Sequence, residues 1–386
     1  MTSQASETKQ RVAGDRVHPY DRWIESQGIP VYRAYHVDSV RTLELAPWAL
    51  RGCDAAFLQL AGQEGVSAAY VMEIPPKATL EPFHMAVDEV VYVAQGGGLT
   101  TIWAEGHPQQ TFEWEKFSIF LLPANYTYQL TNTSGTEPVR LMFTNGLPTA
   151  MAAIPNPEFF FNSTVVDLST LYGEEGGAYS EARVVQDDRG AGRNLWIGNF
   201  FPNMFVWDKL EPFRRRGSGG RVVWFTFPSV VHGSHMSVFP ARTYKKAHRH
   251  GPGVVIIIPT GDGYSVMWPP GEQPAEKRVT YWGEGSVFVP PSGWWHQHFN
   301  AGAEDARYVA IHAPTGMPTG ASVFTDSRGE QITQLAHEQI EYPDEDPWIR
   351  EKFESELTKR SVTTAMPDEA YADPSYEWTY AEDERP

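Results

Sequence analysis

Short apolar runs separated by glycine and proline recur along most of the chain. They lie at 68–74, 89–94, 117–122, 222–227, 254–258, 286–289 and 308–312. Strands of this length, bounded by turn residues, are typical of β-sandwiches and β-barrels. No strong apolar period of 3.6 residues interrupts them, so the pattern predicts an all-β fold with only short flanking helices.

The two halves of the chain repeat each other at a constant offset. Three pairs of residues are each 165 positions apart: Pro47 and Pro212, Gly52 and Gly217, and Trp103 and Trp268. Solenoid repeats have periods of roughly 20–50 residues, so this offset indicates a whole domain used twice. We expect a polar arm at 1–30, a first barrel at 31–150, a connecting segment at 151–200, a second barrel at 201–316 and an extension at 317–386.

The extension combines one expected helix with an acidic tail. Asp346 followed by Pro347 predicts an N-cap and a first helical turn, leading a helix that runs to Lys359. The tail from Thr363 is rich in Asp and Glu. We expect it to be a solvated arm that contacts a partner subunit in a homo-oligomer.

Charge and cysteine content restrict the partners and the location. The net charge is −17 and no basic patch is evident, which excludes nucleic acid and anionic membrane surfaces as expected partners. No apolar run approaches the ~18 residues of a membrane helix, and residues 1–17 lack a signal-peptide pattern. The single cysteine, Cys53, allows no intrachain disulfide, which fits a reducing compartment, and we expect a cytoplasmic protein. We expect its partner to be a small molecule.

Four histidines in the second half form two His-x-His pairs. His248 and His250 precede one apolar run, and His296 and His298 follow another. Residues i and i+2 of a strand share one face, so two adjacent strands aim these imidazoles into one interior. Either pair alone is commonly packed core histidine. Two pairs beside Gly/Pro turns favour a site for a first-row divalent metal such as Fe, Mn, Ni or Zn.

The spacing around these histidines resembles the two sequence motifs of the cupin superfamily. The stretch 285–300 matches the second motif, with Pro291, Gly293 and His296 in register, and His248-x-His250 resembles the start of the first. The glutamate that normally follows in the first motif is replaced by valine. The resemblance implies two tandem cupin (jelly-roll β-barrel) domains, a bicupin, with His248, His250 and His296 as metal ligands and no acidic ligand.

The first copy matches the same motifs less completely. Glu89 fits the glutamate position and His84 fits a histidine position, but Tyr128 stands where the second motif has its histidine. Two ligands are too few for a tight metal site. We expect a non-catalytic barrel in which His84 and Glu89 form either a buried hydrogen-bonded pair or a second weak site.

The ligand pattern resembles the gentisate and hydroxynaphthoate ring-cleaving dioxygenases, which are bicupins with a three-histidine Fe(II) site, although that site is typically in their first barrel. The resemblance implies a non-haem Fe(II) dioxygenase that uses O₂ and a small aromatic or enol-type substrate chelating through two oxygens. Two alternatives remain: a redox-neutral metal-dependent isomerase, lyase or decarboxylase, and a non-catalytic bicupin that binds a small ligand.

Four further residues are candidates for the same site. His298 shares the face of His296 and is either an acid/base, a group that orients a ligand, or core packing. Trp268 and Trp294 are candidates for flanking the substrate. Lys246 shares the face of His248 if the strand already runs there, and would hold a substrate carboxylate.

Overall fold

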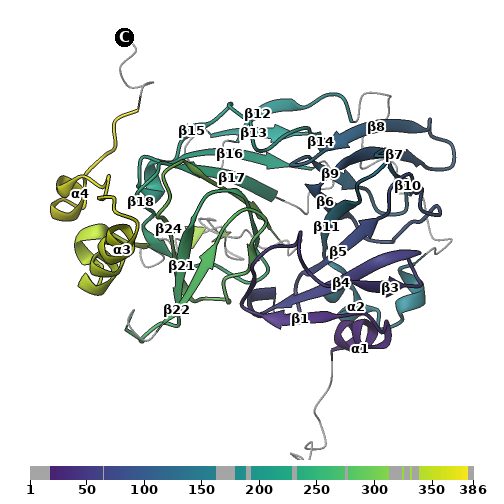
Figure 1. Cartoon of the computed structure of the whole chain (residues 1–386), viewed down its shortest axis with the longest axis horizontal. Helices are drawn as coiled ribbons and strands as arrows, with labels where there is room; N and C mark the ends of the chain where they lie inside the picture. The colour runs from purple at the N-terminus through teal and green to yellow at the C-terminus, as the bar shows by residue number, and fades with distance from the viewer. Residues whose placement is uncertain are drawn as a thin grey trace, which may run out of the picture.

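The computed structural model describes residues 18–63, 65–161, 179–187, 193–227, 233–273, 277–312, 324–325, 331–332 and 339–380. Within these residues the chain forms two β-barrels side by side, with two helices of the C-terminal extension at one end (Figure 1). The barrels repeat at the offset expected from the sequence, because β5 (Ala68–Ile74) and β17 (Gly233–Phe239) are 165 residues apart.

The first barrel is built from two sheets. The larger runs in the order β1 (Val31–Ala34), β4 (Cys53–Leu60), β5, β11 (Val139–Asn145), β6 (Glu89–Gln95) and β9 (Ile119–Leu122), and β3 (Ala46–Trp48) pairs with β4. The smaller runs in the order β10 (Thr127–Asn132), β7 (Gly97–Trp103) and β8 (Gln110–Glu115). Bridges from Thr79 to Thr131 and from Phe83 to Tyr128 add residues 79–83 beside β10.

The second barrel repeats this plan. Its larger sheet runs β12 (Arg183–Asp187), β13 (Arg193–Ile197), β16 (Arg221–Thr226), β17, β25 (Ala306–Ile311), β20 (Val255–Thr260) and β23 (Val287–Phe288), with β15 (Glu211–Pro212) beside β16. Its smaller sheet runs β22 (Arg278–Trp282), β21 (Gly263–Trp268), β24 (Trp295–Asn300), β19 (Ala247–His248) and β28 (Gln339–Ile340), with β18 (Thr243–Tyr244) beside β24. A separate hairpin joins β26 (Phe324–Thr325) to β27 (Gln331–Ile332).

Both barrels have jelly-roll connectivity. Counted from β5 or β17, the first, eighth, third and sixth strands form one sheet, and the second, seventh, fourth and fifth form the other. The predicted all-β fold with two tandem jelly-roll barrels and few short helices is therefore confirmed. The segment 151–200, expected to be only a connection, contributes β12 and β13 to the second barrel's larger sheet.

Each barrel donates one short strand to the other. Strand β2 (His36–Val37), from the first copy, pairs with β23 of the second barrel, and β14 (Phe200–Phe201) pairs with β9 of the first barrel. Matching serines fix both exchanges: the Oγ of Ser286 donates to the carbonyl of Asp38, and the Oγ of Ser118 donates to that of Pro202, each at 2.6 Å. A continuous apolar core of residues from both copies lies between the barrels.

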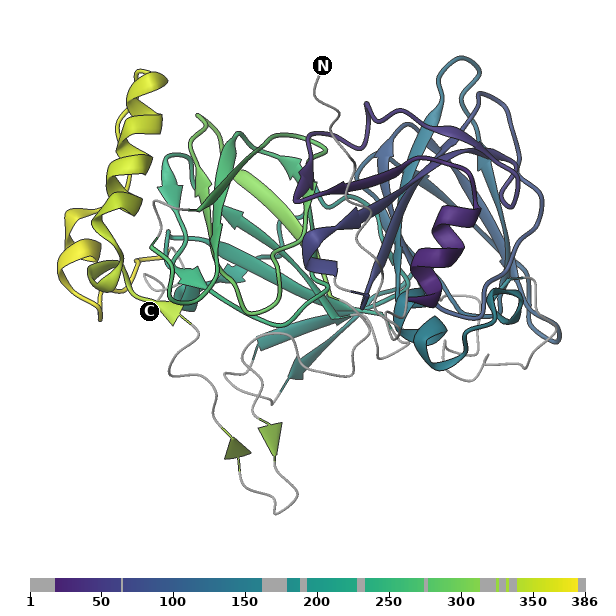
Figure 2. The same cartoon turned by 90° about the horizontal axis from the view of Figure 1, so that it is seen from below.

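Helices lie on the outside of both barrels (Figure 2). Helix α1 (Pro19–Ser26) lies within the predicted polar arm, and it buries Trp23 and Ile24 in the core of the first barrel. Helix α2 (Leu147–Ala153) follows β11. The predicted helix is confirmed as α3 (Pro347–Lys359), whose N-cap Asp346 accepts a hydrogen bond from the backbone N–H of Trp348 at 2.9 Å. Within the described residues, 3₁₀ turns lie at Ala61–Gln63, Pro157–Phe159, Arg214–Arg216 and Tyr342–Asp344.

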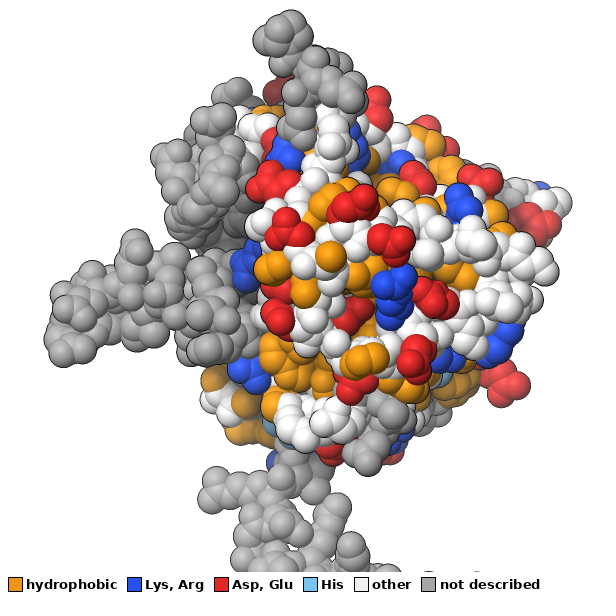
Figure 3. Space-filling view, turned by 90° about the vertical axis from the view of Figure 1, so that its left-hand side faces the viewer, with side chains coloured by type: hydrophobic (Ala, Val, Ile, Leu, Met, Phe, Trp, Pro, Cys, Tyr) orange, Lys and Arg blue, Asp and Glu red, His pale blue; other side chains and the backbone are white. Residues whose placement is uncertain are grey.

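The C-terminal extension packs on the outer face of the second barrel. Helix α4 (Asp368–Ala372) follows α3, and Met366, Ala370 and Tyr380 are buried although we expected a solvated arm from residue 363. These apolar residues, spaced between acidic ones, account for the docking. Figure 3 looks onto this face, over which acidic side chains are scattered. Glu351 and Glu354 of α3 are exposed. The acidic run 382–384 lies outside the described residues.

No helix in the described part of the chain is long and apolar enough to cross a membrane.

Candidate metal centre

Three histidines of the second barrel converge in its interior. His248 in β19 lies directly opposite His296 in β24, and His250 follows two residues after His248. The ring centroids of His248 and His250 lie 4.3 and 4.5 Å from that of His296. One ring nitrogen from each histidine falls within 4.8 Å of the other two, a spacing that suits coordination of one metal ion.

Backbone carbonyls set the tautomer of all three imidazoles. The Nδ1–H of His250 donates to the carbonyl of Gly251 at 2.8 Å, that of His296 to Trp294 at 3.1 Å, and that of His248 to Lys246 at 3.3 Å. A neutral imidazole with its proton on Nδ1 presents a free lone pair on Nε2, which is the form that binds metals. The buried Nε2 of His296 has no hydrogen-bond partner in the described structure.

Burial keeps these imidazoles uncharged. Desolvation lowers the pKa of His248 and His296 well below 6.5, and the Arg216 guanidinium and neighbouring imidazoles add to the effect. Burial likewise lowers the pKa of His250 to about 4. In the described part of the chain no carboxylate joins the cluster. The donor set is therefore three neutral nitrogens, which fits a first-row divalent transition metal better than Mg²⁺ or Ca²⁺.

His298 shares the interior with this cluster but has a different environment. Its ring centroid lies 5.6 Å from that of His296 and 6.0 Å from that of His248. Its Nδ1 lies 2.8 Å from the Oγ of Ser265, which in turn accepts a hydrogen bond from the indole Nε1–H of Trp282 at 3.0 Å. Burial lowers the pKa of His298 to about 3. It is therefore a neutral imidazole held through its Nδ1.

Two basic residues lie inside the same barrel. Lys245 is fully buried, with its Nζ hydrogen-bonded to the Oγ of Ser237 and lying over the rings of Phe213, Phe239 and Tyr308. No ion pair with a carboxylate is found for it in the described structure. Burial lowers its pKa well below 10.5.

Arg216 is also buried, and its Nη1 donates to the Oε1 of Gln339 at 2.9 Å.

The structure gives the side chains of the other sequence candidates neighbours other than the three imidazoles. Trp268 lies on the face of β21 opposite Ser265 and packs in the apolar cluster beneath the extension. Lys246 pairs with Glu341 of the extension instead of facing the histidines. Trp294 lies in the turn before β24, where its ring centroid is 6.2 Å from that of Tyr35 in the first copy.

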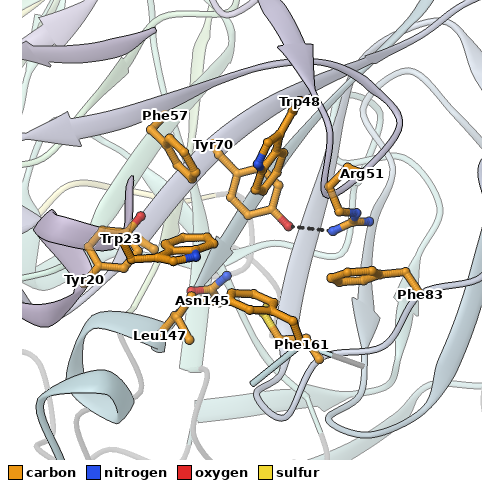
Figure 4. A pocket seen from close by; sticks show the side chains of 12 residues that line it. Tyr20, Trp23, Trp48, Arg51, Phe57, Tyr70, Phe83, Asn145, Leu147 and Phe161 are labelled. Atoms are coloured by element: carbon orange, nitrogen blue, oxygen red, sulfur yellow. Dashed lines mark hydrogen bonds between the residues drawn. The ribbon is translucent and has the colours of Figure 1, made fainter. Parts of the chain in front are cut away.

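The first barrel fills the equivalent position with a closed network. Phe83 and Tyr128 bridge each other where His248 and His296 do in the second barrel. The carboxylate of Glu89 accepts hydrogen bonds from the hydroxyls of Tyr70 and Tyr128, and the Nη1 of Arg51 lies 3.9 Å away. Figure 4 shows Arg51 and Tyr70 at the edge of an aromatic-lined pocket.

His84 is only half-buried, whereas Glu89 and the neighbouring Phe83 are buried in the core. Described residues contain no second metal-binding cluster of three side chains.

The inward position of Lys245 was not found from the sequence, because alternation along a strand that continued through His248 would place Lys246, not Lys245, on the face of His248. The strand breaks between β18 and β19, so Lys245 and His248 both point inward although they are three residues apart. The internal repeat contains the pattern that would have indicated this inward position of Lys245. At the 165-residue offset Lys245 and His248 match Leu80 and Phe83, which are both buried in the first barrel.

Comparisons with known proteins add little to this geometry. No family model and no curated protein matches the chain. Among solved structures, oxalate decarboxylase from Bacillus subtilis aligns with a TM-score of 0.45 at 13% identity, covering 72% of this chain and 76% of that one. Vicilin from Corylus avellana (hazelnut) aligns with a TM-score of 0.44 at 14% identity, covering 73% and 86%. At these values neither likeness supports an argument about activity, and the fold rests on the strand connectivity itself.

Proposed function

We propose that the second barrel binds one divalent first-row metal ion through His248, His250 and His296, and that the bound metal serves an enzyme. The observation that carries this proposal is the convergence of three neutral imidazoles, His248 and His296 buried and His250 half-buried, each with its Nδ1–H donated to a backbone carbonyl so that Nε2 carries the lone pair. Keeping such groups in a barrel interior is costly unless a partner satisfies them. A metal ion is that partner.

The reaction we propose is oxygenation with Fe(II). Three neutral ligands leave the ion its full charge, and an ion that prefers six-coordination keeps up to three positions open. Such an ion supplies Lewis acidity and holds two reactants side by side. The substrate we propose is a small aromatic or enol-type compound that chelates through two oxygens, with dioxygen as the second reactant. Mn, Ni and Zn fit the same donor atoms.

A redox-neutral isomerase, lyase or decarboxylase at the same centre is the second candidate. The observation that favours it is the buried guanidinium of Arg216 beside the amine of Lys245, whose N–H groups can donate to a substrate carboxylate. This reaction needs Lewis acidity but no dioxygen.

The test begins with the metal content of the protein as isolated, followed by anaerobic loading with Fe(II) and measurement of O₂ uptake. The panel contains hydroxylated aromatic acids and enediols. We expect about one metal ion per chain, uptake with at least one compound, and loss of both in His296→Ala. The matched control is His84→Ala in the first barrel, which should retain both.

Three other outcomes are informative. Absence of O₂ uptake by fully loaded protein across the panel contradicts the oxygenase. Turnover under nitrogen with Mn, Ni or Zn supports the redox-neutral enzyme. Failure of the wild-type chain to hold any of these metals contradicts both and leaves a non-catalytic ligand-binding protein.

A further inference from the structure

A chain of hydrogen bonds leads from the wall of the second barrel to His298. The indole Nε1–H of Trp282 donates to the Oγ of Ser265 at 3.0 Å, and that Oγ lies 2.8 Å from the Nδ1 of His298. Trp282 and Ser265 lie on neighbouring strands β22 and β21, and His298 lies opposite Ser265 on β24. All three residues are buried, so water does not compete for these bonds.

The direction of the second hydrogen bond follows from counting donors and acceptors. An indole N–H only donates, so one lone pair of Ser265 is taken by Trp282. If His298 carried its proton on Nδ1, the Ser265 oxygen would accept twice and its own hydroxyl proton would be left without an acceptor in the described structure. A buried unsatisfied donor costs more than the bond gains. Ser265 therefore donates to Nδ1.

We propose that Ser265 and Trp282 are positioning residues that fix His298 as a neutral imidazole with its proton on Nε2, making it a hydrogen-bond donor inside the metal barrel. This is the opposite tautomer from the three metal ligands, whose Nδ1–H groups donate to backbone carbonyls. A donor in the interior shared with the metal stabilises an oxygen that carries negative charge on the bound substrate. The stabilisation of a substrate oxygen by His298 rests on the proposed function, whereas the tautomer does not.

The first barrel provides an internal control for this arrangement. There the indole Nε1–H of Trp114 donates to the Oγ1 of Thr100 at 2.9 Å, but Leu130 occupies the position of His298. Glycines at equivalent positions make room for both indoles: a Cβ on Gly98 or Gly263 would lie 2.5 Å from the ring of Trp114 or Trp282. The tryptophan–hydroxyl bond thus belongs to the barrel framework, and its extension to an imidazole belongs to the second barrel alone.

The direct test is the tautomer itself, measured by long-range ¹H–¹⁵N correlation spectra of the full-length protein loaded with Zn²⁺, with His298 assigned from the spectrum of His298→Gln. We expect the Nε2–H form in the wild type, a loss of this preference in Ser265→Ala, and its return in Ser265→Thr. Thr100→Ala is the matched control and should leave the histidine signals unchanged. A wild-type His298 protonated on Nδ1 or on both nitrogens overturns the proposal.

Kinetics separate this proposal from the proposed function. Once a substrate is known, Ser265→Ala should lower kcat/KM about 10-fold, the value of one misdirected hydrogen bond, with metal content unchanged. Ser265→Thr and Thr100→Ala should stay within about twofold of wild type. A Ser265→Ala protein with both the wild-type tautomer and wild-type kcat/KM overturns the positioning role. Failure of the chain to bind metal overturns the proposed function, while the tautomer can still be measured on the metal-free protein.

Discussion

The first barrel has apolar side chains at interior positions where the second barrel has polar ones. Leu80 donates its backbone N–H to the carbonyl of Leu130, and Lys245 donates its N–H to that of His298, each at 3.0 Å. Met72 pairs with Leu141 in the first barrel. At the equivalent position of the second barrel, the polar residues Ser237 and Tyr308 pair with each other. The same fold therefore forms with either interior. Because burying polar groups costs free energy, the polar set of the second barrel is best explained by chemistry.

At the position of Glu89 the difference between the two interiors is reversed: the first barrel has a polar residue and the second an apolar one. Glu89 is buried in the first barrel and held by Tyr70, Tyr128 and Asn145, so its charge serves the barrel's own packing. At the 165-residue offset the second barrel has Val254, and the buried Nε2 of His296 has no hydrogen-bond partner in the described structure. One interior satisfies its polar groups internally, and the other leaves them for a ligand.

The largest effect is expected from exchanging one residue between the barrels. His296→Tyr introduces the residue that the first barrel has at this position, Tyr128, and removes one of the three proposed metal ligands. We expect metal affinity to fall at least about 100-fold while the fold is retained. Elemental analysis and circular dichroism measure the two properties. Retention of stoichiometric metal by this variant would show that the three imidazoles are not the binding site.

The second effect is on the stability of the first barrel. Glu89→Ala leaves the buried guanidinium of Arg51 without its carboxylate, and we expect a loss of about 3–5 kcal/mol in the free energy of unfolding. The control is Glu25→Ala, which removes an exposed ion pair with Arg33 and should cost less than about 1 kcal/mol. Urea denaturation measures both. A change in metal content in Glu89→Ala would contradict the separation of the two sites.

The third effect concerns the extension, whose residues 339–380 pack on the second barrel. Glu345 accepts hydrogen bonds from the hydroxyl of Tyr244 and the amide of Gln297, but its burial raises its pKa from 4.5 to about 7. The folded protein therefore holds this proton more tightly than the unfolded chain does. The stability gained is complete below pH 4.5 and is lost as the pH rises through 7.

Glu345→Gln should remove this pH dependence. The new amide can donate to the Oε1 of Gln297, which has no partner in the described structure. We expect a gain of the order of 1 kcal/mol above pH 7 and little change near pH 4.5. Thermal unfolding across this pH range measures the difference. A variant that is less stable than wild type at pH 8 would contradict the assigned cause.

The smallest effect is expected at the N-terminus of α3. Asp346→Ala removes the side chain that accepts the N–H of Trp348, and we expect a loss of about 1 kcal/mol in the stability of the helix. Asp344→Ala is the control, because this exposed residue precedes the cap. Hydrogen exchange of the α3 amides measures the loss. Equal exchange in both variants would show that the barrel surface alone holds the helix.

The fold and the ligand cluster were predictable because they depend on local patterns. Apolar runs between Gly and Pro give the strands, the offset of Trp103 and Trp268 gives the duplication, and Asp346 before Pro347 gives the helix. The spacing of His248 and His296 also predicted residues that the structure brings together. The resemblance to ring-cleaving dioxygenases stays a prediction.

Other features depend on contacts that no local pattern records. The break between β18 and β19 turns Lys245 inward and Lys246 toward Glu341, which alternation along a single strand cannot predict. Trp268 faces outward because the extension covers that side of β21. The hydrogen bonds to His298 join three strands, so they appear only once the sheet register is known.

The exchange of β2 and β14 means that the two halves are not separable. If the chain were divided between the repeats, the first barrel would lose β14 from the edge of its sheet and the second would lose β2. Each half would also keep a short strand, β2 or β14, that has no partner within that half. A polypeptide consisting of one repeat would satisfy both needs only by associating with a second copy across a twofold axis. The present chain is in this sense a covalently tethered dimer, whose two barrels share one architecture and differ in their interiors.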